Sequence, residues 1–216
     1  MKFTDVLAKV LWDSGVRCVF GLQGGAVVHI FDSLEKHGFD VTYTQHEQTA
    51  GFASSTYARL NGIGCCVTTT GPGSTNALTA LLGAWQDSLP CCFISGQVRS
   101  AHVSYGKKIR QFGTQESPIV DIVKPISKHT YYVEEPELFH SKFIQALEIA
   151  KSGRPGPVWI DIPLEHQWAE IPYQPFMKDK DRTFIHADEN SYEKFFNLVE
   201  NARRPLLVLG NGIHLS

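Results

Sequence analysis

One stretch of the sequence, residues 64–76, decides the fold class and reads GCCVTTTGPGSTN. Its first part, Gly64 to Thr70, is a short run rich in β-branched side chains, which predicts a buried strand. Gly71-Pro72-Gly73 predicts a tight turn, because such turns favour glycine and proline. A helix is predicted from Ser74 to Trp85. A strand that passes through a glycine turn into a helix is the repeating unit of α/β domains with parallel sheets.

The same alternation continues on both sides of this stretch. Further strands are predicted at residues 18–21, 41–44, 91–95, 131–133 and 157–162. Further helices are predicted at residues 26–36, 46–59, 118–123 and 137–151, after a first helix that Thr4 caps and Gly15 ends. Because parallel crossovers are right-handed, this order predicts an α/β fold with a doubly wound parallel sheet of about six strands and helices on both faces.

The character of the chain changes after Pro163. We predict a first domain at residues 1–163, a linker at 164–190 that is rich in proline and polar residues, and the truncated start of a second α/β domain at 191–216. The last region offers one helix, at 191–202, and one strand with a glycine turn, at 204–212. Two elements cannot bury a core by themselves, which is why we expect this second domain to be incomplete.

Composition limits the function classes. The 216 residues are 43% hydrophobic and 19% charged, as in ordinary globular proteins, with a net charge of -2 and a pI near 6.5. This balance gives no reason to expect nucleic acid or a membrane as a partner. The N-terminus lacks the apolar core of a signal peptide, and no apolar stretch has the length of a bilayer span, so we expect a cytoplasmic protein.

The five cysteines are Cys18 and two vicinal pairs, Cys65-Cys66 and Cys91-Cys92. Neighbouring side chains on a strand point to opposite faces, which is poor geometry for a disulfide or a metal site. We therefore predict buried, reduced thiols.

Three successive strand ends carry the residues suited to a ligand site. They read Gly21-Leu22-Gln23-Gly24-Gly25, His46-Glu47-Gln48 and Gly71-Pro72-Gly73-Ser74-Thr75-Asn76. In open α/β sheets, ligands bind at the carboxyl ends of the strands. Each group alone also has an ordinary structural explanation, as an acid at a helix start, a hydrogen-bonding histidine or a capped turn. The turns lack the lysine of a P-loop and the spacing of a dinucleotide motif, so neither of those sites is predicted.

The order of these groups resembles the thiamine-diphosphate-dependent enzymes, and within them the acetolactate synthase group. The resemblance runs from about Phe3 to Ile162. Its motifs are Val19-Phe20-Gly21 with Gly24-Gly25-Ala26, His46-Glu47-Gln48, Tyr57-Ala58-Arg59, Thr70-Gly71-Pro72-Gly73 with Thr75-Asn76, Ile94-Ser95-Gly96-Gln97-Val98, Gln115-Glu116, Lys124-Pro125-Ile126-Ser127-Lys128-His129 and Gly153-Arg154-Pro155-Gly156-Pro157-Val158. Eight modest motifs in the same order make the resemblance specific.

The resemblance implies that this region binds the aminopyrimidine half of thiamine diphosphate. Glu47 matches the family's catalytic carboxylate, which hydrogen-bonds a ring nitrogen of the aminopyrimidine and helps to move a proton. Gly71, Pro72, Gly73 and Asn76 match the turn beside the aminopyrimidine. Gln23, Gly24 and Gly25 match the loop near the cofactor and substrate, and Gln115 matches a glutamine that approaches the reaction centre. The implied activity is that of a carboligase or decarboxylase acting on a 2-keto acid.

Some parts of the family's pattern differ or are absent. Leu22-Gln23 stands where the group usually has Tyr-Pro, and Thr114 stands where it usually has an aromatic residue. The segment between Val98 and Gln115 looks longer and carries five basic side chains, namely Arg99, His102, Lys107, Lys108 and Arg110. This segment is interpreted either as a solvated surface loop or as a basic lip for an acidic or phosphorylated substrate.

The family's magnesium ligands belong to a Gly-Asp-Gly motif, which this chain lacks. The resemblance therefore implies Mg²⁺ bound by residues outside this chain, and a homodimer at least, because two subunits share each site in this family. It is compatible with FAD in further domains and does not require it. The alternative hypothesis is a non-catalytic, stand-alone pyrimidine-type domain with a structural or partner-binding role.

Overall fold

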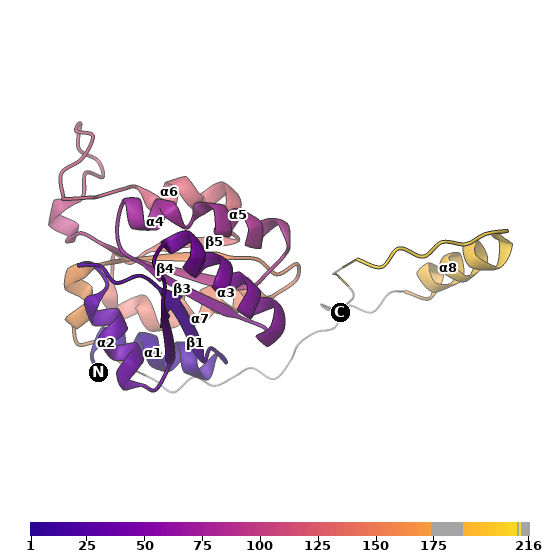
Figure 1. The fold of residues 1–216 in the computed structure, drawn as a ribbon, viewed down its shortest axis with the longest axis horizontal. Helices are drawn as coiled ribbons and strands as arrows, with labels where there is room; N and C mark the ends of the chain where they lie inside the picture. The colour runs from indigo at the N-terminus through magenta and orange to yellow at the C-terminus, as the bar shows by residue number, and fades with distance from the viewer. Residues whose placement is uncertain (174–187, 211, 213–216) are drawn as a thin grey trace. The chain divides into compact units, whose positions relative to one another are not determined.

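The computed structural model describes residues 1–173, 188–210 and 212 (Figure 1). The chain divides into two compact units, Met1–Phe176 and Met177–Ser216. Residues of the predicted linker up to Ile171 pack into the first unit: Gln167 is fully buried, and its carbonyl oxygen accepts a hydrogen bond from Thr4. The middle of the predicted linker, residues 174–187, lies outside the described residues.

A six-stranded parallel sheet forms the centre of the first unit. Its strands are β1 (Cys18–Gly21), β2 (Asp40–Tyr43), β3 (Gly64–Thr68), β4 (Cys91–Gln97), β5 (His129–Tyr132) and β6 (Val158–Pro163). Their order in the sheet is β2-β1-β3-β4-β6-β5, and every neighbouring pair is parallel. The predicted doubly wound sheet is thereby confirmed. The chain reverses its direction of winding between β1 and β3, which places a switch point there.

Helices cover both faces of this sheet (Figure 1). The helices of the first unit are α1 (Phe3–Asp13), α2 (Val28–Lys36), α3 (Glu47–Asn61), α4 (Pro72–Asn76), α5 (Leu78–Gln86), α6 (Ile119–Val123) and α7 (Phe139–Lys151). On one face, α1, α2 and α7 enclose a core that includes Phe3, Phe31 and Phe143. On the other face, α3, α5 and α6 enclose a second core that includes Phe93 and Trp159. Apolar burial on both faces is what a parallel sheet requires.

The cysteines follow the predicted alternation. Cys65 and Cys92 pack in the core beneath α1, whereas Cys66 and Cys91 pack in the core beneath α3. All five are free thiols, and Cys18 is only half-buried. Burial raises the pKa of the Cys66 thiol well above its usual value. The four core cysteines therefore act as small apolar side chains in the folded protein.

Two predicted helix boundaries were wrong. Thr4 does not cap α1: Lys2 holds the cap position, and the Thr4 hydroxyl is buried against Gln167. The predicted helix from Ser74 to Trp85 is two helices, α4 and α5, which meet at Ala77. A local hydrogen bond ties α4 to the end of the preceding strand, because the Ser74 hydroxyl donates to the Thr69 carbonyl oxygen at 2.7 Å. Helix propensity alone does not predict such a break.

The second unit contains the helix α8 (Glu189–Asn201), close to the predicted helix at 191–202. Asp188 caps it by accepting a hydrogen bond from the Ser191 amide at 2.6 Å. The predicted strand at 204–212 was wrong for its described part, since residues 205–210 pair with no other strand. Leu206 and Val208 are 87% and 82% exposed. An apolar segment becomes a strand only when a neighbour satisfies its backbone groups, and the described residues provide none.

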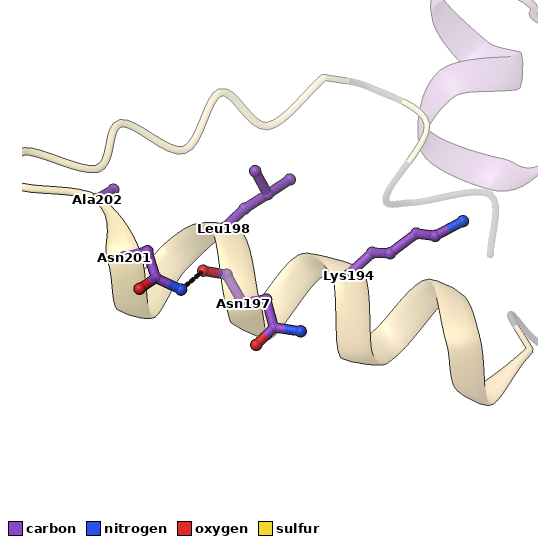
Figure 2. A pocket seen from close by; sticks show the side chains of 5 residues that line it. All are labelled: Lys194, Asn197, Leu198, Asn201 and Ala202. Atoms are coloured by element: carbon purple, nitrogen blue, oxygen red, sulfur yellow. Dashed lines mark hydrogen bonds between the residues drawn. The ribbon is translucent and has the colours of Figure 1, made fainter.

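An open hollow runs along one side of α8 (Figure 2). It is lined by Lys194, Asn197, Leu198, Asn201 and Ala202, and the Asn201 amide donates to the Asn197 carbonyl oxygen at 2.8 Å. All of these residues come from the end of one helix, so the hollow reflects an uncovered helix face and gathers no reactive side chains. None of the helices within the described ranges has the length and apolar character needed to cross a membrane.

Candidate functional site

The three strand ends identified from sequence meet around the switch point of the sheet. Gly24 follows β1, Glu47 follows β2, and the turn at Gly71 follows β3. Because β1 pairs with β2 on one side and with β3 on the other, the three connections emerge next to one another at the carboxyl edge. This is the position at which open α/β sheets bind ligands.

Glu47 is a buried carboxylate with only one of its two oxygens bonded. It is the first residue of α3 and is 7% exposed. The side-chain amide of Asn76 donates to its Oε2 at 2.9 Å. Among the residues that the structure describes, none donates a hydrogen bond to Oε1. Because Oε1 is not one of the enclosed and unbonded side-chain atoms of the described residues, it is accessible, and a ligand donor can bond it.

The helix that carries Glu47 begins at this point because of His46. The His46 ring nitrogen Nδ1 accepts a hydrogen bond from the Gln48 amide at 3.1 Å, which caps α3. This agrees with the structural role expected for that histidine. The cap fixes the first turn of α3 and thereby the backbone from which Glu47 extends.

Gly73 packs closely beside the free oxygen of Glu47, at a position where a side chain would not fit. A Cβ atom at Gly73 would lie 3.3 Å from Glu47 Oε1 and 2.7 Å from Thr69 Cγ2. Thr69 also fills the space beside Gly24, where an added Cβ would come within 2.5 Å of the threonine Cβ. Thr69 thus packs between the two glycine loops. It was missed from sequence, and its position as the residue after β3 was the available signal.

Gly71 and Gln115 form the closest backbone contact of the site. Gly71 has a φ of +61°, and an added Cβ would lie 2.1 Å from the Gln115 carbonyl oxygen. Gln115 itself has a φ of +61°, a conformation that non-glycine residues rarely adopt. The Thr70 hydroxyl lies 3.2 Å from the same carbonyl oxygen. The structure therefore brings the backbone of Gln115 to the Gly71 turn.

Three other predicted residues make no contact with the Glu47 carboxylate. Gln23 donates to the Tyr43 hydroxyl at 2.9 Å, and that hydroxyl donates to Glu35 at 2.6 Å. Burial, followed by the bond to Glu35, raises the pKa of Tyr43 to about 12. Gly25 is exposed, and an added Cβ there would meet no atom within 4 Å. Pro72 is exposed at the start of α4.

The long segment before Gln115 is folded around Glu116. One carboxylate oxygen of Glu116 accepts hydrogen bonds from the amide and hydroxyl of Ser104, and the other accepts from the amides of Phe112 and Gly113. Burial opposes ionisation here, but these bonds lower the pKa of Glu116. Lys107 lies over the Phe112 ring at 4.2 Å from its centroid. The basic side chains of this segment are exposed.

A second buried acid, Asp161, lies in β6. It is fully buried, and it accepts hydrogen bonds from the Ser95 hydroxyl at 2.5 Å and from the Gln97 side-chain amide at 3.0 Å. Burial raises the pKa of Asp161 to about 7, although both hydrogen bonds act in the opposite direction. No basic side chain forms an ion pair with it among the described residues.

Comparison with known families identifies the family of this chain. The family described as thiamine pyrophosphate enzyme, N-terminal TPP binding domain, matches residues 1–123. The chain belongs to the thiamine pyrophosphate enzyme family. Thiamine pyrophosphate is another name for thiamine diphosphate, so the resemblance drawn from the motifs is confirmed. The matched segment contains Glu47, Asn76 and Gln115, the residues that the structure gathers at the switch point.

Relatives within this family include acetolactate synthase large subunits. The probable acetolactate synthase large subunit of Methanocaldococcus jannaschii is 35% identical, isozyme 2 of Escherichia coli is 34% identical, and acetolactate synthase 1, chloroplastic, of Oryza sativa subsp. japonica is 36% identical. Each alignment covers 100% of this chain, but only 37%, 38% and 34% of the respective relative. The chain therefore spans little more than a third of the length of these relatives.

The described residues provide polar groups at this site but no metal-binding cluster. No cluster of three or more histidine, cysteine, aspartate or glutamate side chains suited to a metal ion occurs within residues 1–173, 188–210 and 212. The thiamine pyrophosphate family domain found here is the N-terminal one. Its gathered side chains are an acid, amides and a hydroxyl, which suit the polar edge of an aromatic ring.

Proposed function

We propose that this chain supplies the aminopyrimidine half of the cofactor site in an acetolactate synthase-like carboligase or decarboxylase that acts on a 2-keto acid. The observation that carries this proposal is the Glu47 carboxylate, which is buried, held at Oε2 by Asn76 and unbonded at Oε1. The acid is anchored by the fold at one oxygen and accessible at the other, which leaves that oxygen available to a ligand. The names of the relatives support the type of reaction.

The residues at the switch point fit an aminopyrimidine ring. Gly73 lets the backbone of the turn pass close to Glu47 Oε1, since an added Cβ would lie 2.7 Å from Thr69 Cγ2, and the ring edge would approach this same oxygen. Glu47 would donate or accept a proton at a ring nitrogen, and Asn76 would hold the carboxylate in position. When bound, thiamine diphosphate supplies a carbon nucleophile that attacks the carbonyl group of a keto acid. Gln115 would approach the substrate side of that centre.

Other parts of the site are proposed to come from outside residues 1–216. The cofactor's diphosphate needs a cation such as Mg²⁺ with oxygen ligands, and the described residues gather no such set. The relatives are more than twice as long as this chain, which leaves room for a diphosphate-binding domain and for FAD, if one is bound.

We also propose a cytoplasmic homo-oligomer, at least a dimer. The side chains of Phe52 on α3 and of Leu82 and Trp85 on α5 are 46%, 40% and 39% exposed on two helices that pack together. Apolar side chains gathered on neighbouring helices are typical of protein interfaces. By contrast, Ala50 and Ser54 of α3 are fully buried inside the unit and cannot contact another subunit.

The decisive experiment replaces Glu47 by glutamine in an active assembly that contains this chain. Glutamine preserves the shape and the bond to Asn76 but cannot exchange the proton, so turnover of pyruvate with thiamine diphosphate and Mg²⁺ should fall by roughly 10²–10⁴-fold. Turnover is followed by release of CO₂ and by formation of the coupled product. Glu148→Gln, the same chemical change at an exposed position of α7, is the matched control and should retain full turnover.

Unchanged turnover in the Glu47→Gln variant would refute the role of this acid. Absence of thiamine-dependent turnover in the wild-type assembly, with every 2-keto acid tested, would instead favour the non-catalytic, stand-alone domain.

A further inference from the structure

A buried amide, the side chain of Gln97, occupies the end of β4 next to the candidate site. Gln97 is fully buried, and each of its polar side-chain groups is bonded. Its Nε2 donates to the Ser117 carbonyl oxygen at 2.9 Å and to Asp161 at 3.0 Å. Its Oε1 accepts from the Thr70 hydroxyl at 2.9 Å and from the Val98 amide at 2.9 Å. Two donors and two acceptor sites are all that a glutamine side chain offers.

This saturation fixes the orientation of the amide. Rotating it by half a turn would place its NH₂ group against the Thr70 hydroxyl and the Val98 amide, and its oxygen against two acceptors. The rotated amide could still donate to the Thr70 hydroxyl, but it would lose its bonds with the Val98 amide and the Ser117 carbonyl oxygen, which disfavours that orientation in a dry environment. Gln97 therefore holds the backbone groups that it bonds, at Val98 and Ser117, in fixed positions.

The backbone held in this way belongs to Gln115 and its neighbours. Gln97 bonds the carbonyl group of Ser117, while the Thr70 hydroxyl is shared between Gln97 Oε1 and the Gln115 carbonyl oxygen. Gln115 has a φ of +61° and lies against the side-chain-free face of Gly71. A non-glycine residue stays in this conformation only when its surroundings hold it there. The contacts from Thr70 and Gln97 are such surroundings.

We infer that Gln97 and Thr70 are positioning residues, which clamp the backbone at Gln115–Ser117 and so set the place of the Gln115 side chain at the cofactor edge. The inference rests on the proposed function for its catalytic consequence, because it assumes that Gln115 approaches the substrate. The clamp itself is a statement about backbone order and can be measured without any cofactor. Asp161 anchors the clamp from the sheet side through its bond to Gln97.

The first experiment measures hydrogen exchange in the 216-residue chain. Thr70→Val keeps the shape of the side chain and removes only the shared hydroxyl, so the peptide containing residues 112–118 should exchange about tenfold faster. The peptide covering α3 serves as the internal control and should be unchanged. Thr70→Ser retains a hydroxyl and should restore slow exchange. Unchanged exchange in Thr70→Val would overturn the clamp.

Gln97→Met provides a second and stronger variant, since it removes all four amide contacts while keeping the length of the side chain. It should increase exchange at residues 112–118 by more than Thr70→Val does. Thr70→Val remains informative if Gln97→Met fails to fold, because it leaves the bond between Gln97 and Asp161 in place.

The second experiment is a double-mutant cycle in the active assembly. Thr70→Val should lower kcat about tenfold with little change in KM, and Thr70→Ser should recover most of it. In a Gln115→Ala background, Thr70→Val should cost less than about twofold, because the side chain to be positioned is gone. An equal loss in both backgrounds would show that Thr70 does not act through Gln115.

The two proposals fail in different ways. If exchange is faster in Thr70→Val but the wild-type assembly shows no thiamine-dependent turnover, the clamp is supported and the proposed function is refuted. Normal turnover with unchanged exchange in Thr70→Val would support the function and refute the clamp.

Discussion

Two buried acids near the carboxyl edge of the same sheet differ in how the fold hydrogen-bonds their oxygens. Asp161 accepts hydrogen bonds at both of its oxygens, from Ser95 and from Gln97. Glu47 accepts one hydrogen bond, from Asn76, and its second oxygen has no donor among the described residues. Asp161 is completely enclosed, whereas Glu47 is 7% exposed, so only Glu47 is within reach of a molecule outside the fold.

This difference is the basis for the proposal that Asp161 serves the fold whereas Glu47 serves a ligand. The donors to Asp161 come from β4, the strand that pairs with its own, in a register that sets Ser95 opposite Asp161. The donor to Glu47 is Asn76, the last residue of the short helix α4, which follows β3. Each oxygen of Asp161 has a donor from the fold, whereas one oxygen of Glu47 has none among the described residues.

The largest expected effect concerns pH and Asp161. Its pKa in the folded protein, about 7, lies above the value of about 4 in an unfolded chain, so the folded state binds the proton more tightly. Stability contributed by the protonated acid is complete below pH 4 and is lost as the pH rises toward 7. Relative to Asp161→Asn, the wild type should lose up to about 4 kcal/mol of unfolding free energy over this range.

The measurement is urea unfolding of both proteins at several pH values, which cancels the titration of all other groups. Asp121→Asn, the same change at an exposed position of α6, is the control for the substitution itself. A difference for Asp161→Asn that does not vary with pH would mean that folding leaves the pKa of Asp161 unchanged, against this prediction.

The second-largest effect is expected at Gly71, where the turn packs against Gln115. Gly71→Ala places a methyl group 2.1 Å from the Gln115 carbonyl oxygen, at a φ that side chains disfavour. We expect a loss of about 3 kcal/mol in unfolding free energy. Gly25→Ala, where an added Cβ meets nothing within 4 Å, should change stability by less than about 0.5 kcal/mol. Equal values for the two variants would show that the Gly71 contact is not tight in solution.

The same two acids show how much of this molecule could be predicted from its sequence. Glu47 was found because a motif surrounds it and because strand ends in this fold class carry ligand sites. The β-branched and apolar runs predicted the six strands for the same local reason. Asp161 and Gln97 carry no local signal of their contact, because their proximity depends on the register between β4 and β6. Register is a property of pairing that a single sequence does not display.

The errors have a similar origin. Residues 205–210 have the apolar composition of a strand, yet a strand also needs a partner, which composition cannot supply. Thr69 was overlooked because its importance lies in packing between two loops that are far apart along the chain. Patterns of short range were thus predictable, whereas contacts that join distant segments were predictable only where a family motif marked them.

A smaller effect is expected from the single donor to Glu47. Asn76→Ala removes the amide that holds Oε2 and leaves the carboxylate free to rotate, so turnover of the active assembly should fall about tenfold. Asn61→Ala, which removes an exposed amide at the end of α3, is the matched control and should retain turnover. A loss in Asn76→Ala as large as that in Glu47→Gln would indicate that Asn76 contacts the cofactor directly.

The smallest effect provides the strictest test of the comparison. If Glu47 is retained for a ligand and contributes little to folding, Glu47→Gln should change the unfolding free energy by less than about 0.5 kcal/mol, since the new amide oxygen can still accept from Asn76. Urea unfolding at pH 7 measures it. A loss above about 2 kcal/mol would mean that the folded state depends on the charge of Glu47. A small value, joined to a large loss of turnover, is the combination that distinguishes a catalytic acid from a structural one.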